Sequence, residues 1–125
     1  MENLSNEILD YCQQHSSEES EVLKQVVRNT HLYLLQPRML SGHFQGVFLE
    51  FISKMISPNR ILEIGTYSAY SCICLAGGLR EGGKLITIEK NPELDYLIKK
   101  HIDLAKLSNK ITNLIGDAAD IIPTL

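Results

Sequence analysis

The acidic and glycine residues that could do chemistry stand where short apolar runs end. Glu63 and Gly65 follow a first run, Glu89 closes a second, and residues 116–118 (GDA) follow a third. In an open parallel sheet the ligand lies outside the carboxyl ends of the strands, so these residues would meet at one edge. A carboxylate placed there can accept hydrogen bonds from both hydroxyls of a ribose. The pattern indicates a site for a nucleotide-like ligand.

The glycine content of the first turn bears on which ligand this is. A dinucleotide fingerprint has three glycines, so that backbone amides can approach a pyrophosphate, whereas here Gly65 is followed by Ala69 at the fourth position. An NAD-linked fold is therefore the weaker alternative. S-adenosylmethionine fits better because it has no phosphate, an adenosine for the acids and an amino-acid tail for the turn. An acid about 20 residues beyond the turn is the expected ribose partner, and Glu89 takes that place, although a solvated acid at a strand end is its plainer interpretation.

The elements that must position these residues follow from hydrophobic periodicity. Residues 60–64, 84–89 and 111–115 have the composition of buried strands. Helices are predicted over 68–79 and from Asn91, the N-cap before Pro92, to about Leu107, and another begins near Asp120. This βαβαβ order is typical of the first half of a doubly wound α/β sheet.

Three helices are predicted before the first strand. The first covers residues 3–15, capped by Asn3 or Ser5. The second begins with a capping box of Ser16 and Glu19 and ends near Gln36 because Pro37 cannot continue it. The third covers residues 46–56. We expect residues 1–57 to form a helical cap in the same domain as the half sheet of residues 58–125.

Composition limits the class of protein. With 125 residues, 44% hydrophobic and 22% charged, the chain fits one globular domain. A net charge of −3 argues against a nucleic-acid partner. Three cysteines without a pairing pattern favour a reducing compartment, with Cys72 and Cys74 in the core. No apolar run is long enough for a membrane helix and no leader pattern is present, so a cytoplasmic location is expected.

Taken together, these stretches resemble the successive motifs of a known family. Residues 62–71 (LEIGTYSAYS), 83–89 (GKLITIE), 110–111 and 116–118 resemble class I S-adenosylmethionine-dependent O-methyltransferases of the caffeoyl-CoA and catechol type, and so do Met39, Ser41 and Gly42 upstream. The agreement in order and spacing runs from about residue 37 to residue 125. The fold that this implies is α/β: N-terminal helices and the first βαβαβ half of a Rossmann-like sheet, incomplete at the C-terminus.

The resemblance implies a set of cofactor contacts in this chain. Ser41, Gly65, Tyr67 and Ser71 would surround the methionine part, with Thr66 in the same turn. Glu63 would lie at the floor of the site and orient the amino group, and Glu89 would hold the ribose hydroxyls. Asp117 and Ala118 would lie against the adenine. Family members commonly have glycine where this chain has Ala69, and cofactor affinity is the property that this difference would affect.

The family's catalytic and metal-binding residues lie beyond the resembling stretch. We therefore expect no catalytic and no metal-binding residue within this chain, and a divalent metal such as magnesium only in a complete protein. His15, His31, His43 and His101 are given no ligand role. The expected function is O-methyl transfer to a hydroxyl of a small phenolic or catechol-like molecule by a homodimer. The alternative is a non-catalytic fragment that binds cofactor or partner and associates through the unfinished sheet edge after the third strand.

Overall fold

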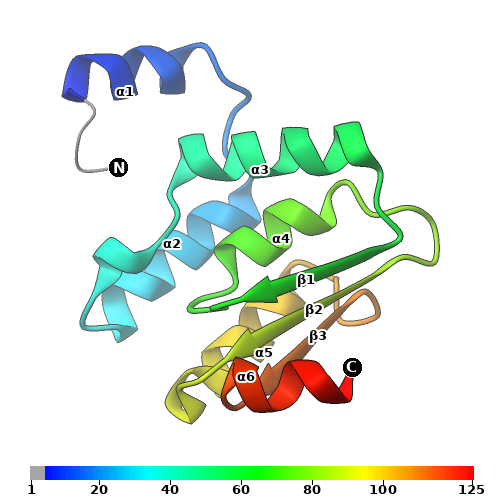
Figure 1. Ribbon diagram of the computed structural model, residues 1–125. Helices are drawn as coiled ribbons and strands as arrows, with labels where there is room; N and C mark the ends of the chain where they lie inside the picture. The colour runs from blue at the N-terminus through cyan, green and yellow to red at the C-terminus, as the bar shows by residue number, and fades with distance from the viewer. Residues whose placement is uncertain (1–4) are drawn as a thin grey trace.

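The computed structural model describes residues 5–125 as a short parallel sheet with helices around it (Figure 1). The order of α-helices, 3-10 helices (η) and strands is α1 (Asn6–Gln14), α2 (Glu21–Tyr33), η1 (Pro37–Met39), α3 (His43–Ile56), β1 (Arg60–Ile64), α4 (Tyr70–Ala76), β2 (Lys84–Glu89), η2 (Pro92–Leu94), α5 (Asp95–Leu104), β3 (Ile111–Ile115), α6 (Ala118–Ile121) and η3 (Ile122–Thr124).

The three strands pair in parallel in the order β1-β2-β3. Their residue ranges agree with the predicted strands, and the α/β prediction is confirmed. All three arrowheads in Figure 1 point to the same side, so the segments that follow the strands lie together there. In the described part of the chain, β1 and β3 are both edge strands, and Leu62 and Ile64 of β1 are 47% and 63% exposed.

The main core lies between the sheet and helices α4 and α5. Leu85 of β2 and Ile98 of α5 are fully buried, and they belong to one cluster with Cys72 of α4. The prediction that Cys72 and Cys74 are packing residues is confirmed, because both are buried. Helices α2 and α3 pack on α4, so they form a further layer over that helix (Figure 1). Contact between α3 and α4 is close enough that a Cβ on Gly46 would lie 2.7 Å from Cε1 of Tyr70.

The predicted start of the second helix is wrong. The hydroxyl of Ser16 donates to the Cys12 carbonyl at the end of α1, and the N-cap of α2 is Ser20, which accepts from the Leu23 amide. Glu19 is occupied by a tertiary contact instead, since its carboxylate accepts a hydrogen bond from the Tyr70 hydroxyl. A local sequence pattern could not include that distant partner.

Other helix ends differ by a few residues. Helix α1 has Ser5 as its N-cap, while Asn3 lies outside the described residues. Helix α2 ends at Tyr33 rather than near Gln36, because Leu34 is already extended. Helix α3 begins at His43, ahead of the predicted residue 46, and α5 ends at Leu104. Helix α6 begins at Ala118, earlier than predicted, with Asp117 as its cap. The predicted cap at Asn91 is confirmed, as its side chain accepts from the Glu93 amide.

Helix α4 is the largest departure, with seven residues in place of the predicted 68–79. Ser68 and Ala69 belong to the preceding turn, where Ala69 has a left-handed backbone with φ of 69°.

No helix among residues 5–125 is long and apolar enough to cross a membrane.

Candidate functional site

The turn between β1 and α4 has an unusual backbone. Gly65, Tyr67 and Ala69 have φ values of 90°, 51° and 69°. Glycine adopts this region freely, whereas for other residues it costs about 1–2 kcal/mol each. Hydrogen bonds hold the turn in place: the Gly65 amide donates to the Ile88 carbonyl at 2.8 Å, and the Ala69 amide to the Thr66 carbonyl at 2.9 Å. Backbone strain of this kind is often found at ligand sites.

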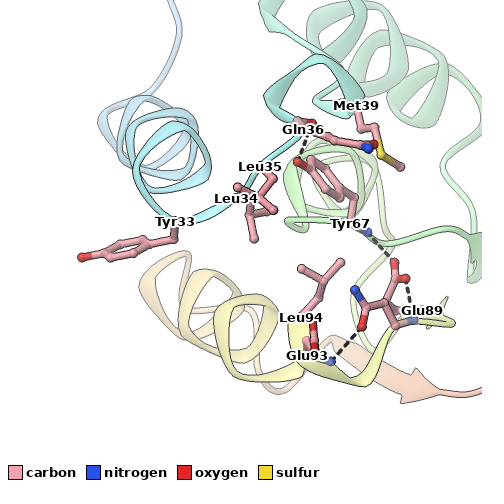
Figure 2. Close-up of a pocket in the computed structure, with 10 residues that line it drawn as sticks. Tyr33, Leu34, Leu35, Gln36, Met39, Tyr67, Glu89, Glu93 and Leu94 are labelled. Carbon is pink, nitrogen blue, oxygen red and sulfur yellow. Dashed lines mark hydrogen bonds between the residues drawn. The ribbon is translucent and has the colours of Figure 1, made fainter.

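Glu89 at the end of β2 is fixed by two backbone amides (Figure 2). Its Oε2 accepts from the Tyr67 amide at 2.8 Å, and its Oε1 accepts from the Asn91 amide at 2.9 Å. The side chain is nearly buried, with 9% exposure. The predicted ribose partner is therefore a preoriented carboxylate whose remaining lone pairs can accept from a ligand.

Glu63 lies beneath the turn and binds hydroxyl groups of the protein itself. Its Oε1 accepts from the Ser71 hydroxyl, and its Oε2 accepts from the Thr87 hydroxyl at 2.6 Å. Thr66 joins the same group, with its hydroxyl 2.6 Å from that of Thr87. Burial raises the pKa of the Glu63 carboxyl, and the hydrogen bonds from Ser71 and Thr87 act in the opposite direction. The arrangement supplies negative charge at the floor of the turn.

A cavity of about 500 Å³ opens beside Glu89. Its walls are mostly apolar, with Leu34 and Leu94 on opposite sides in Figure 2 and Tyr67 between them and the sheet. The hydroxyl of Tyr67 donates to the Gln36 carbonyl at 2.6 Å, which ties the loop after α2 to the turn. This loop therefore forms one wall of the cavity.

A smaller cavity of about 40 Å³ lies against the turn itself. It shares Met39 and Tyr67 with the larger cavity. Its lining includes five of the predicted site residues: Ser41, Gly65, Thr66, Tyr67 and Ser71. The structure therefore brings the predicted methionine contacts together around one space rich in hydroxyl groups.

The predicted adenine contacts lie at the end of β3, outside both cavities. The Gly116 amide donates to the Glu89 carbonyl at 2.8 Å, which sets the GDA segment beside the end of β2. Asp117 uses both carboxylate oxygens: Oδ1 accepts from the Ala119 amide, and Oδ2 accepts from Lys90 at 2.9 Å. The hydrogen bond from Lys90 is the main cause that lowers the pKa of Asp117. Ala118 begins α6 next to this pair.

Several residues of the site were missed from the sequence. Thr87 carried a signal, because it stands two positions before Glu89 and so shares its face of the strand. The sequence predicts only a helix cap at Asn91, although its amide also fixes Glu89. The sequence pattern indicates no role for His101, yet it is fully buried and contacts the turn. His43 begins α3, and its Nε2 lies 2.7 Å from the Ser17 carbonyl oxygen.

Comparison with known proteins identifies the family to which the chain is similar. Residues 13–125 match the model of a family described as O-methyltransferase. Catechol O-methyltransferase of Mus musculus is 31% identical over 120 residues, which cover 94% of this chain and 44% of that protein. Catechol O-methyltransferase of Niastella koreensis is 38% identical over 81 residues, or 65% of this chain and 37% of that protein. The chain thus spans less than half the length of these relatives.

Solved structures give the same result. The O-methyltransferase TomG from Streptomyces achromogenes, solved in complex with SAM, has a TM-score of 0.86 at 30% identity and matches 96% of this chain and 53% of its own. An O-methyltransferase from Bacillus cereus in complex with SAH has a TM-score of 0.88 at 27% identity, over 94% of this chain and 53% of its own. The sequence and the fold agree, and the chain belongs to the O-methyltransferase family.

Proposed function

We propose that this chain binds S-adenosylmethionine at the carboxyl ends of its strands. The observation that carries the proposal is the Glu89 carboxylate, which lines the larger cavity and is held by the amides of Tyr67 and Asn91. A carboxylate fixed in this way can accept hydrogen bonds from two ribose hydroxyls at little cost in side-chain entropy. The relatives solved with SAM and SAH support the same ligand.

The charge of the site also supports this ligand. S-adenosylmethionine carries a sulfonium and an ammonium group, and the site presents the carboxylates of Glu63 and Glu89. The small cavity beside the turn would take the amino-acid end, through the hydroxyls of Ser41, Thr66 and Ser71 and the backbone of Gly65 and Tyr67. Glu63 would act on the ligand from beneath the turn through its charge, because its two carboxylate oxygens already accept hydrogen bonds from the hydroxyls of Ser71 and Thr87.

The adenine would lie toward Asp117 and Ala118. Both carboxylate oxygens of Asp117 already have partners, so an adenine amino group would share Oδ1 with the Ala119 amide or Oδ2 with Lys90. Each carboxylate oxygen has two acceptor sites, and sharing is therefore possible. Within this chain, these residues bind and orient the cofactor.

For the complete protein we propose O-methyl transfer to a hydroxyl of a small phenolic or catechol-like acceptor. The cofactor supplies an electrophilic methyl group, and holding donor and acceptor in line accounts for much of such catalysis. The names of the relatives support the acceptor class. Among residues 5–125 no group of three or more His, Cys, Asp and Glu could hold a metal ion. The residues of this chain therefore do not fit the expected divalent metal, and no step is assigned to it.

Isothermal titration of the chain with S-adenosylhomocysteine tests the binding proposal. We expect a one-to-one complex, with adenosine binding more weakly because it leaves the small cavity empty. NAD is the contrasting ligand, and binding of NAD in place of S-adenosylhomocysteine would overturn the proposal. Methyl transfer to catechol by a longer protein that contains this chain tests the activity separately.

A second candidate function is association without catalysis. The apolar side chains of β1 that face away from α4 are exposed, and the exposed face of α3 carries Phe48, Phe51, Met55 and Ile56. An open strand edge beside apolar surface favours pairing with another chain. We propose a second copy of this chain as that partner, which is also the expected homodimer.

A further inference from the structure

A buried histidine contacts the turn that the proposed cofactor site depends on. His101 of α5 is fully buried, and its Nδ1 lies 2.8 Å from the carbonyl oxygen of Ser68. A carbonyl oxygen can only accept, so Nδ1 must carry the proton in this contact. The hydrogen bond joins two parts of the chain that are 33 positions apart. The sequence gives no local reason for it.

The other side of the imidazole fits the same neutral tautomer. Nε2 of His101 lies 3.0 Å from Nδ2 of Asn29 in α2, which is also buried, so the amide donates and the ring accepts. The side-chain Oδ1 of Asn29 accepts in turn from Nε2 of Gln25 at 2.9 Å. Burial lowers the pKa of His101, which keeps the ring neutral. In each of these three contacts a donor therefore meets an acceptor.

The backbone of Ser68 depends on the hydrogen bond from His101, because within residues 5–125 the Ser68 side chain makes no hydrogen bond that could hold the residue in place. Among the described residues, its buried hydroxyl has no hydrogen-bond partner. Its neighbours Tyr67 and Ala69 both have left-handed backbones. Such backbones cost free energy and persist only where the surrounding structure holds them. A hydrogen bond to the carbonyl between two such residues therefore helps to hold the shape of the turn.

We propose that His101 is a positioning residue for the cofactor: its Nδ1–H holds the Ser68 carbonyl and thereby keeps the turn in the shape that binds the amino-acid end of the ligand. The inference rests on the proposed function, since the turn lines the small cavity. His101 acts through Ser68 and does not itself line either cavity. Its loss should therefore change affinity as well as stability.

Three substitutions separate positioning from packing. His101→Leu removes both hydrogen bonds, whereas His101→Asn keeps a donor where Nδ1 stood and loses the contact with Asn29. Ile102→Val is the matched control, because it weakens the core next to His101 without touching Ser68. All three should lower the midpoint of thermal unfolding. Only His101→Leu should weaken binding of S-adenosylhomocysteine, by about 5- to 10-fold, and His101→Asn should restore most of it.

Nitrogen chemical shifts of the His101 ring in the unsubstituted chain provide a test that needs no variant to fold. We expect the Nδ1–H tautomer, and the Nε2–H tautomer would overturn the inference because the bond to Ser68 could not exist. Wild-type affinity in a folded His101→Leu variant would also overturn it, leaving a packing role only. Failure of the unsubstituted chain to bind S-adenosylhomocysteine would overturn the proposed function instead, and the tautomer would still decide whether His101 anchors Ser68.

Discussion

The backbone amide of Tyr67 donates to Oε2 of Glu89 at 2.8 Å, so the turn after β1 is bound directly to the acid at the end of β2. One of these predicted site residues lies in the turn after β1 and the other ends β2, so the contact joins two separate segments of the chain. The amide of a residue with a strained backbone gains a carboxylate acceptor, and the carboxylate gains a fixed orientation. Hydrogen bonds to charged groups are worth about 1.5–3 kcal/mol, enough to offset the strain at one such residue.

Replacing Glu89 should therefore weaken both the turn and the ligand complex. Glu89→Ala should reduce the affinity for S-adenosylhomocysteine by about 1–3 kcal/mol, because the ribose hydroxyls lose their acceptor. Titration calorimetry measures this, and Glu93→Ala on the wall of the same cavity is the control. A ligand that lacks both ribose hydroxyls isolates the contact between Glu89 and the ribose. Glu89→Ala should reduce the affinity for that ligand less than it reduces the affinity for S-adenosylhomocysteine. Equal losses for both ligands would contradict the ribose assignment.

Ala69 provides a test of the backbone alone. Its φ of 69° favours glycine, while its methyl group is fully buried in the core. Ala69→Gly relieves about 1–2 kcal/mol of backbone strain and loses about 0.8 kcal/mol of burial, so a small net stabilisation is expected. Ala76→Gly is the control, since it loses a buried methyl in a helix without relieving strain. Chemical denaturation should show a higher free energy of unfolding for Ala69→Gly and a lower one for Ala76→Gly. Equal destabilisation by the two substitutions would contradict this account.

The strands could be predicted because their signal is local. Residues 84–89 and 111–115 are β-branched and apolar between turns, and the structure has the same bounds. The helix ends were harder. Ser16 and Ser20 are both acceptable caps, and Glu19 accepts a hydrogen bond from the Tyr70 hydroxyl 51 positions away instead of completing a capping box with Ser16. Tertiary contacts of this kind decide helix ends and are absent from a sequence pattern.

The residues of the site also fall into those that a sequence pattern predicts and those that depend on tertiary packing. Glu89 and Gly65 could be predicted because strand ends meet at one edge of a parallel sheet. Thr87 was within reach through strand alternation. Asn29 and His101 were not, because 72 positions separate them and neither lies near a strand end. Their contact with each other depends on how α2 and α5 pack, which hydrophobic periodicity does not specify.

Glu63 makes stability depend on pH with a defined sign. Burial raises its folded-state pKa above the ordinary value of 4.5, so the folded chain holds the proton more tightly than the unfolded chain. Its contribution to stability is complete below that value and is lost as pH rises through the folded pKa. Glu63→Gln should therefore gain stability relative to the unsubstituted chain as the pH rises above 4.5. Thermal unfolding across this range tests it, with exposed Glu81→Gln as the control expected to leave the profile unchanged.

Self-association should depend on the exposed edge of β1. Ile64 is 63% exposed on an edge strand, and burying such a side chain against another copy contributes about 1.5–3 kcal/mol. A lysine there opposes strand pairing, so Ile64→Lys should weaken self-association at least about 10-fold. Leu32→Lys, at 64% exposure on α2, is the matched control and should leave the mass unchanged. Size-exclusion chromatography with light scattering measures both. A monomeric unsubstituted chain would contradict edge pairing, because removing Ile64 can then have no effect on association.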